Sequence, residues 1–95
     1  MRLSSHLRDE FLKASKEAFG EAKVILFGSR IDDSKRGGDF DLAVKCDLNR
    51  NEFKRAKVRF IRYLLQKDLD LPIDLVNYNL SSDLLKQEID KGAAL

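Results

Sequence analysis

The chain combines two kinds of hydrophobic pattern, stripes at helical spacing and short continuous apolar runs. In and just before residues 4–19, apolar side chains recur every three to four positions, at Leu3, Leu7, Phe11, Ala14 and Ala18. Because these positions fall on one side of a helix with 3.6 residues per turn, the pattern predicts an amphipathic helix. Ser4 or Ser5 is its expected N-cap, and Gly20 is expected just past its end.

Three short apolar runs predict strands. Residues 23–28 are rich in β-branched and large apolar side chains and end in a Gly-Ser turn signal, and residues 40–45 form a second run. A third strand is expected over residues 73–76, directly after Pro72, because proline is tolerated at the first position of a strand. The segment between the first two strands, residues 30–38, is polar and ends in two glycines, so it is predicted to be a loop.

Two further helices are predicted after the second and third strands. Residues 50–66 give the clearest pattern, with an inward stripe at Phe53, Ala56, Phe60, Ile61, Leu64 and Leu65. The last helix is expected to begin after Ser81 or Ser82, to run to about Lys91, and to end at Gly92. The three residues that follow are expected to form a short extended tail.

The predicted order of elements, α-β-β-α-β-α, indicates an α+β fold with a small mixed three-stranded sheet and helices packed on it. A length of 95 residues favours a single domain, residues 1–95, with a thin hydrophobic core. No apolar stretch approaches the ~20 residues of a membrane span. The N-terminus lacks the apolar region of a signal peptide, so we expect no membrane association and a cytoplasmic protein.

Charge is spread unevenly along the chain. The composition, 43% hydrophobic and 36% charged, is typical of a globular domain, and a net charge of +2 does not by itself indicate nucleic-acid binding. Basic residues are concentrated in the segment 50–67, where Glu52 is the only acid; they are Arg50, Lys54, Arg55, Lys57, Arg59, Arg62 and Lys67. The aromatic residues of this segment fall on the inward stripe and offer no stacking surface for bases. We therefore expect this basic helix to face solvent or a protein partner rather than nucleic acid.

The residues with the most specific chemistry cluster at the ends of the predicted strands. Asp39 and Asp41 open the second strand one residue apart, so their side chains are expected on the same face. Asp74 interrupts the third strand, where a carboxylate is costly unless it is paired or binds a metal ion. If the second and third strands are neighbours, the three carboxylates meet, and a divalent cation would relieve their repulsion. Gly28 has no Cβ, so backbone N–H groups of the first turn can approach a phosphate chain.

Simpler interpretations of these residues stay open. Asp39 and Asp41 could serve turn chemistry, which is common for aspartate, and Asp74 could be solvated on an edge strand. Arg30 could contact phosphate or could pair with the neighbouring acids of the loop. The occurrence of all these residues together favours the metal site over the simpler interpretations.

The combined pattern resembles the minimal nucleotidyltransferase family of the DNA polymerase β-like nucleotidyltransferase superfamily. The resemblance covers most of the chain and is carried by Gly28-Ser29-Arg30, Asp39-x-Asp41 and Asp74. It implies the nucleotidyltransferase fold, with the nucleotide held by Gly28, Ser29 and Arg30. It also implies that two Mg²⁺ ions are bound by the catalytic carboxylates Asp39, Asp41 and Asp74, and that ATP is the substrate.

The resemblance also implies a biological role. Family members of this length are commonly encoded beside a helical HEPN protein, and the two form a toxin–antitoxin pair. The nucleotidyltransferase then transfers AMP from ATP to a tyrosine of the HEPN ribonuclease, which silences the toxin. An alternative is a non-catalytic binding module that neutralises the HEPN partner by direct complex formation. Besides this heteromer, a homodimer of the isolated chain is expected, because small domains that need a partner often self-associate.

Overall fold

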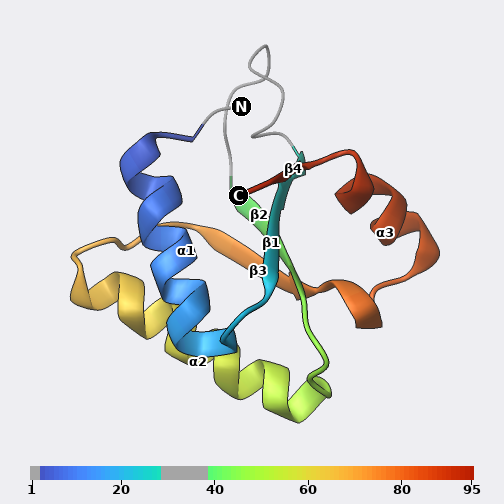
Figure 1. The fold of residues 1–95 in the computed structure, drawn as a ribbon, viewed down its shortest axis with the longest axis horizontal. Coiled ribbons are helices and arrows are strands. Elements are labelled where there is room, and N and C mark those ends of the chain that lie inside the picture. The colour runs from blue at the N-terminus through green and yellow to red at the C-terminus, as the bar shows by residue number, and fades with distance from the viewer. Residues whose placement is uncertain (1–2, 29–38) are drawn as a thin grey trace.

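The computed structural model describes residues 3–28 and 39–95 and places three α-helices and four β-strands within them (Figure 1). Helix α1 spans Ser5–Phe19, α2 spans Arg50–Gln66 and α3 spans Asp83–Asp90. The strands are β1 (Lys23–Phe27), β2 (Phe40–Lys45), β3 (Ile73–Asn77) and β4 (Ala93–Ala94), and a short 3₁₀ helix η2 covers Tyr78–Leu80. None of the helices in the described part of the chain is both long and apolar enough to cross a lipid bilayer.

The sheet is mixed, with strand order β3-β2-β1-β4. Strand β1 pairs antiparallel with β2 and with β4, whereas β2 pairs parallel with β3. The prediction of a mixed sheet in an α+β fold is therefore confirmed, but the prediction of three strands is wrong. Residues expected to form an extended tail instead pair with the free edge of β1, where Leu95 N–H donates to Val24 C=O at 2.9 Å.

The two faces of the sheet are covered by different helices (Figure 1). Helices α1 and α2 pack on one face, where the fully buried side chains of the main core gather: Phe11, Leu26, Leu42, Val44 and Phe60. Helix α3 lies on the other face, where Ile89 packs with Ile25, Phe27 and Ala43. Strand residues alternate between these faces, so neighbouring positions in β2 belong to different cores.

Hydrogen bonds to backbone N–H groups fix where each helix begins. Ser4 caps α1 by accepting from Leu7 N–H, and Ser82 caps α3 by accepting from Leu85 N–H. At the start of α2, Asn49 and Glu52 form a reciprocal capping box. In each pair of serines that the sequence left open, the structure therefore selects one, Ser4 for the first helix and Ser82 for the last.

The inward stripe of α2 is narrower than predicted. Phe53, Ala56, Phe60 and Leu64 are buried, but Leu65 is 50% exposed and Ile61 is only partly buried. Successive helix residues are rotated by about 100°, so Leu65 turns away from the core once Leu64 points into it. The prediction that Leu65 belongs to the inward stripe is wrong.

Gly92 leads from α3 into β4 through very limited space. A Cβ at this position would overlap the carbonyl oxygen of Leu26 and lie 3.0 Å from that of Ile89, and neither backbone atom can move independently. We expect Gly92→Ala to push β4 off β1 and to lower the free energy of unfolding by about 1–3 kcal/mol. Urea denaturation measures this change, and a variant as stable as the wild type would contradict the described packing.

Candidate active site

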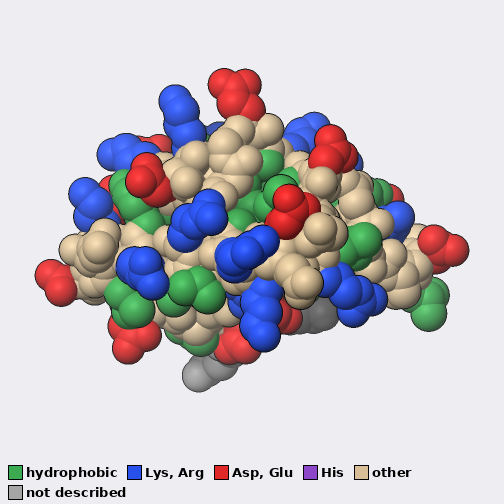
Figure 2. Space-filling view, turned by 90° about the horizontal axis from the view of Figure 1, so that it is seen from below, with side chains coloured by type: hydrophobic (Ala, Val, Ile, Leu, Met, Phe, Trp, Pro, Cys, Tyr) green, Lys and Arg blue, Asp and Glu red, His purple; other side chains and the backbone are tan. Residues whose placement is uncertain are grey.

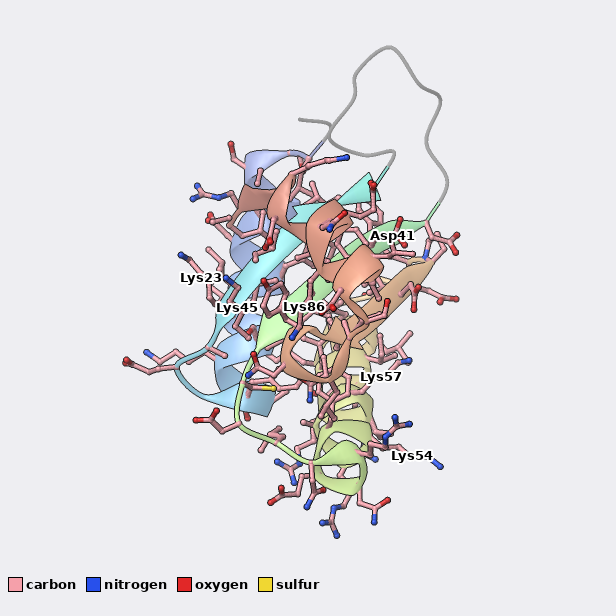
Figure 3. The ribbon with its side chains drawn as sticks, turned by 90° about the vertical axis from the view of Figure 1, so that its right-hand side faces the viewer. Lys23, Asp41, Lys45, Lys54, Lys57 and Lys86 are labelled. Atoms are coloured by element: carbon pink, nitrogen blue, oxygen red, sulfur yellow. The ribbon has the colours of Figure 1, made fainter. Side chains whose placement is uncertain are left out.

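Phe40 fixes the orientation of β2 at its first residue. Its side chain is buried in the main core, where its ring meets Phe11 edge-on at a centroid distance of 5.4 Å. Because adjacent strand residues point to opposite faces, Asp41 is directed to the α3 side of the sheet. Asp39 directly precedes the strand and is exposed. Figure 3 shows Asp41 at the end of the sheet where β2 begins.

The parallel pairing of β2 with β3 brings a second carboxylate to the same place. Asp41 lies directly opposite Asp74, and Phe40 N–H donates to Pro72 C=O at 2.8 Å, which aligns the starts of the two strands. Opposite residues of paired strands share a face, so both carboxylates are on the α3 side. The adjacency of the second and third strands, on which the sequence argument depended, is thus present in the structure.

The electrostatics of Asp41 link all three aspartates. Partial burial raises the pKa of the Asp41 carboxyl, and repulsion by Asp74 and then by Asp39 raises it further. Like charges that lie close together disfavour ionisation of the group between them. The Asp41 carboxyl therefore interacts with both Asp74 and Asp39 at this end of the sheet, and we refer to these three residues as the carboxylate cluster.

Gly28 lies against the same cluster. It follows β1 directly, with a φ of +76°, and β1 ends with Phe27 opposite Asp41. A Cβ on Gly28 would overlap Asp41 Oδ2 and lie 3.3 Å from Asp41 Cγ. Of the three residues predicted to bind nucleotide, Gly28 is thus beside the carboxylates, whereas Ser29 and Arg30 lie outside the described residues.

The family comparison covers the whole of this cluster. The family model described as "Polymerase beta, Nucleotidyltransferase" matches residues 11–95. The chain belongs to this nucleotidyltransferase family. No match was found among curated proteins. Family membership supports nucleotidyl transfer in general, and nucleotidyltransferases of this type generally use Mg²⁺ and nucleoside triphosphates.

The donor chemistry of the site suits such a cation. Mg²⁺ is bound through oxygen ligands, and carboxylates on adjacent positions of two strands supply them without nitrogen or sulfur donors. Burial is the main reason why the pKa of Asp41 is raised, and a divalent cation would offset the smaller contribution, which is repulsion by Asp74 and Asp39. Within residues 3–28 and 39–95, however, no three His, Cys, Asp or Glu side chains are grouped closely enough to hold a metal ion. The assignment of Asp39, Asp41 and Asp74 as metal ligands therefore stays a prediction.

The Tyr78 hydroxyl and the Cys46 thiol are chemically reactive groups outside the carboxylate cluster, and both have raised pKa values. The Tyr78 hydroxyl donates to Asp90 Oδ1 at 2.9 Å, and this hydrogen bond is the main reason why the pKa of Tyr78 is raised. Its ring carries the ammonium groups of Lys45 and Lys86 at 4.5 and 5.5 Å. Burial raises the pKa of the Cys46 thiol, which favours its unreactive protonated form.

The buried polar residues of α1 were not anticipated from the sequence. Glu10 and Ser15 are buried, and within the described part of the structure Glu10 Oε2 and Ser15 Oγ have no hydrogen-bond partner. Both residue types are usually exposed on helices, so the apolar stripe gave no sign of them. The contact between Gly28 and Asp41 was also missed, because it depends on strand pairing that sequence periodicity does not encode.

The raised pKa of Asp41 predicts how stability varies with pH. The folded state binds this proton more tightly than the unfolded chain, so the free energy of unfolding falls as the pH rises from the unfolded value near 3.8 through the raised folded pKa. We expect Asp41→Asn to be more stable than the wild type above this window and equally stable below it. Urea denaturation in the presence of a chelator, from acid to neutral pH, measures the difference. A difference that is independent of pH, or that also occurs for the exposed control Asp70→Asn, would contradict this assignment.

Proposed function

We propose that this chain is a Mg²⁺-dependent nucleotidyltransferase that transfers AMP from ATP to a hydroxyl group of a protein. The acceptor is a tyrosine of a HEPN ribonuclease toxin, and the chain acts as the antitoxin. One observation carries the catalytic part: Asp41 lies opposite Asp74, and the Gly28 backbone lies against the Asp41 carboxylate, in a chain of the nucleotidyltransferase family. The toxin partner is proposed from the resemblance to minimal nucleotidyltransferases.

The proposed reaction assigns a role to each carboxylate. The acceptor oxygen forms a bond to the α-phosphorus, the bond from that phosphorus to the β-phosphate oxygen breaks, and pyrophosphate leaves. Asp74 is exposed and takes the hydroxyl proton, while Asp39 and Asp41 hold the cation. When bound, Mg²⁺ supplies positive charge to the phosphate oxygens. Gly28 leaves room for the triphosphate because it has no side chain.

ATP labelled at different phosphates tests the proposal. The purified chain and its HEPN partner are incubated with Mg²⁺ and with ATP labelled at the α- or the γ-phosphate. We expect label on the HEPN protein only from α-labelled ATP, and none in the presence of a chelator. No transfer of α-label to a well-folded partner would contradict the enzymatic function.

A second candidate function is neutralisation of the HEPN partner by binding alone. It is supported by the basic surface of α2, where exposed apolar side chains are available for protein contact. Asp41→Asn separates the two functions in a ribonuclease assay of the partner. Inhibition that survives this substitution favours binding, whereas inhibition that is lost together with AMP transfer favours catalysis.

Light scattering of the isolated chain tests the expected homodimer.

A further inference from the structure

Helix α2 carries a groove on one flank, next to its buried stripe. The groove has a volume of about 500 Å³ and is lined by Lys54, Lys57, Val58, Ile61, Arg62 and Leu65. We refer to these six residues as the α2 groove. Val58 is 51% exposed and Leu65 is 50% exposed, and Ile61 is partly buried between them. Positions 58, 61 and 65 follow the spacing of a single helix face, so they form a continuous apolar stripe.

Basic side chains border this stripe. With 100° of rotation per residue, Lys57 and Arg62 fall on opposite sides of the three apolar positions, and Lys54 continues the line of the stripe. In residues 50–66 Glu52 is the only acid, and within the described residues no Lys or Arg of α2 forms an ion pair. Figure 2 shows the molecule from below, the side on which α2 lies in Figure 1, with many blue Lys and Arg side chains among green hydrophobic and red acidic ones.

We propose that the α2 groove binds an acidic amphipathic helix of a partner protein. The apolar ridge of such a helix would cover Val58, Ile61 and Leu65, and its Asp and Glu side chains would meet Lys57 on one side and Arg62 on the other. Helix-in-groove recognition uses this combination of a narrow apolar contact and a complementary charged border. The complementarity of charge is what selects an acidic helix from the possible apolar partners.

The same features argue against two other occupants. A second copy of this chain, related by twofold symmetry, would place the basic border against itself. Single-stranded RNA would gain from stacking on aromatic side chains, but Phe53 and Phe60 are buried, and Tyr63 is partly buried with Lys67 Nζ 5.6 Å from its ring centre. Phosphate contacts alone would also leave the exposed Val58 and Leu65 without a role.

The groove and the carboxylate cluster belong to opposite layers. Helix α2 packs on one face of the sheet, whereas Asp41 and Asp74 are on the face that α3 covers, and Figure 3 shows Lys54 and Lys57 well separated from Asp41. A helix bound at α2 would leave the carboxylates accessible. The inference therefore does not depend on the proposed reaction, and it deepens the second candidate function by naming the kind of segment that α2 would bind.

A pair of synthetic helical peptides provides the test. One peptide carries Leu at positions i, i+3 and i+7 with Glu on both sides, and the other has Lys in place of every Glu. We expect the acidic peptide to bind at least about tenfold more tightly by fluorescence anisotropy, and to shift the amide resonances of residues 54–65 in ¹⁵N spectra. Failure of the acidic peptide to bind, equal binding of both peptides, or shifts confined to other elements would each overturn the proposal.

Surface substitutions test the apolar contact and the charged border of the α2 groove separately. The double variant Val58→Ser/Leu65→Ser should weaken the acidic peptide by about tenfold or more, and Lys57→Glu/Arg62→Glu should reverse the preference between the peptides. Leu84→Ser is the matched control, because Leu84 is 76% exposed on α3 and its substitution should leave binding unchanged.

Preferential binding of an oligouridine RNA that the Val58→Ser/Leu65→Ser variant retains would overturn the proposal in favour of nucleic acid. A dimer that this double variant dissociates would overturn it in favour of a second copy.

Discussion

Asp41→Asn is expected to reduce AMP transfer by on the order of 10³-fold without unfolding the protein. The amide keeps the size of the side chain but removes the charge that, in our proposal, binds the cation between Asp39 and Asp74. Loss of several kcal/mol of electrostatic stabilisation in the transition state corresponds to a rate effect of this size. Transfer of α-label from ATP measures the rate, and circular dichroism verifies the fold.

The stability of the same variant gives independent information. Removal of a partly buried carboxylate that Asp74 and Asp39 repel should leave the protein at least as stable as the wild type at neutral pH. Asp70→Asn, a substitution of an exposed aspartate close to β3 in sequence, should change neither activity nor stability. Wild-type activity in Asp41→Asn would contradict the assigned role, and equal loss in Asp70→Asn would show that the effect is not specific to the cluster.

Gly28→Ala is expected to remove most activity, whereas Gly20→Ala should leave it intact. Both glycines have positive φ angles, +76° and +71°, which L side chains rarely adopt, so alanine is strained at either position. Only at Gly28 would the new methyl group also overlap a carboxylate oxygen of Asp41, since nothing lies within 4 Å of a Cβ at Gly20. The two variants thus share the strain and differ in the contact with the site.

The difference in activity between these two variants measures the effect of displacing the Asp41 carboxylate. We expect both variants to lose unfolding free energy in urea, but a loss of activity on the order of 10²-fold for Gly28→Ala alone, because displacement of a catalytic group by about 1 Å has effects of this size. Equal activities of the two variants would show that Gly28 has no part in positioning the carboxylate.

The sequence predicted the elements in which one pattern dominates. Strand β2 has the predicted bounds, and so does α2, because a short apolar run between polar segments and a long apolar stripe leave few alternatives. Asp74 was noticeable because a carboxylate interrupts an apolar strand, and the structure places it opposite Asp41. Asp74 is exposed on the edge strand β3, so its carboxylate is solvated there, as the simpler interpretation allowed; the break in the apolar pattern still led to the candidate site.

The features that the sequence could not predict depend on pairing between distant segments. Strand β4 consists of two alanines, which have no alternation to detect, and it exists because the edge of β1 accepts it. The exposure of Leu65 depends on how α2 is rotated about its axis against the sheet. The apolar stripe in the sequence does not determine that rotation. The overlap of a Gly28 side chain with Asp41 follows from the pairing of β1 with β2.

Paramagnetic broadening by Mn²⁺ tests the central claim, that a divalent cation binds at Asp39 and Asp41, next to Asp74. Mn²⁺ is titrated into ¹⁵N-labelled protein together with an ATP analogue that cannot transfer AMP. We predict that broadening centres on the amides of Gly28, Asp41 and Asp74 and disappears in Asp41→Asn. Broadening that centres on another part of the chain, or that is unchanged in Asp41→Asn, would contradict the account.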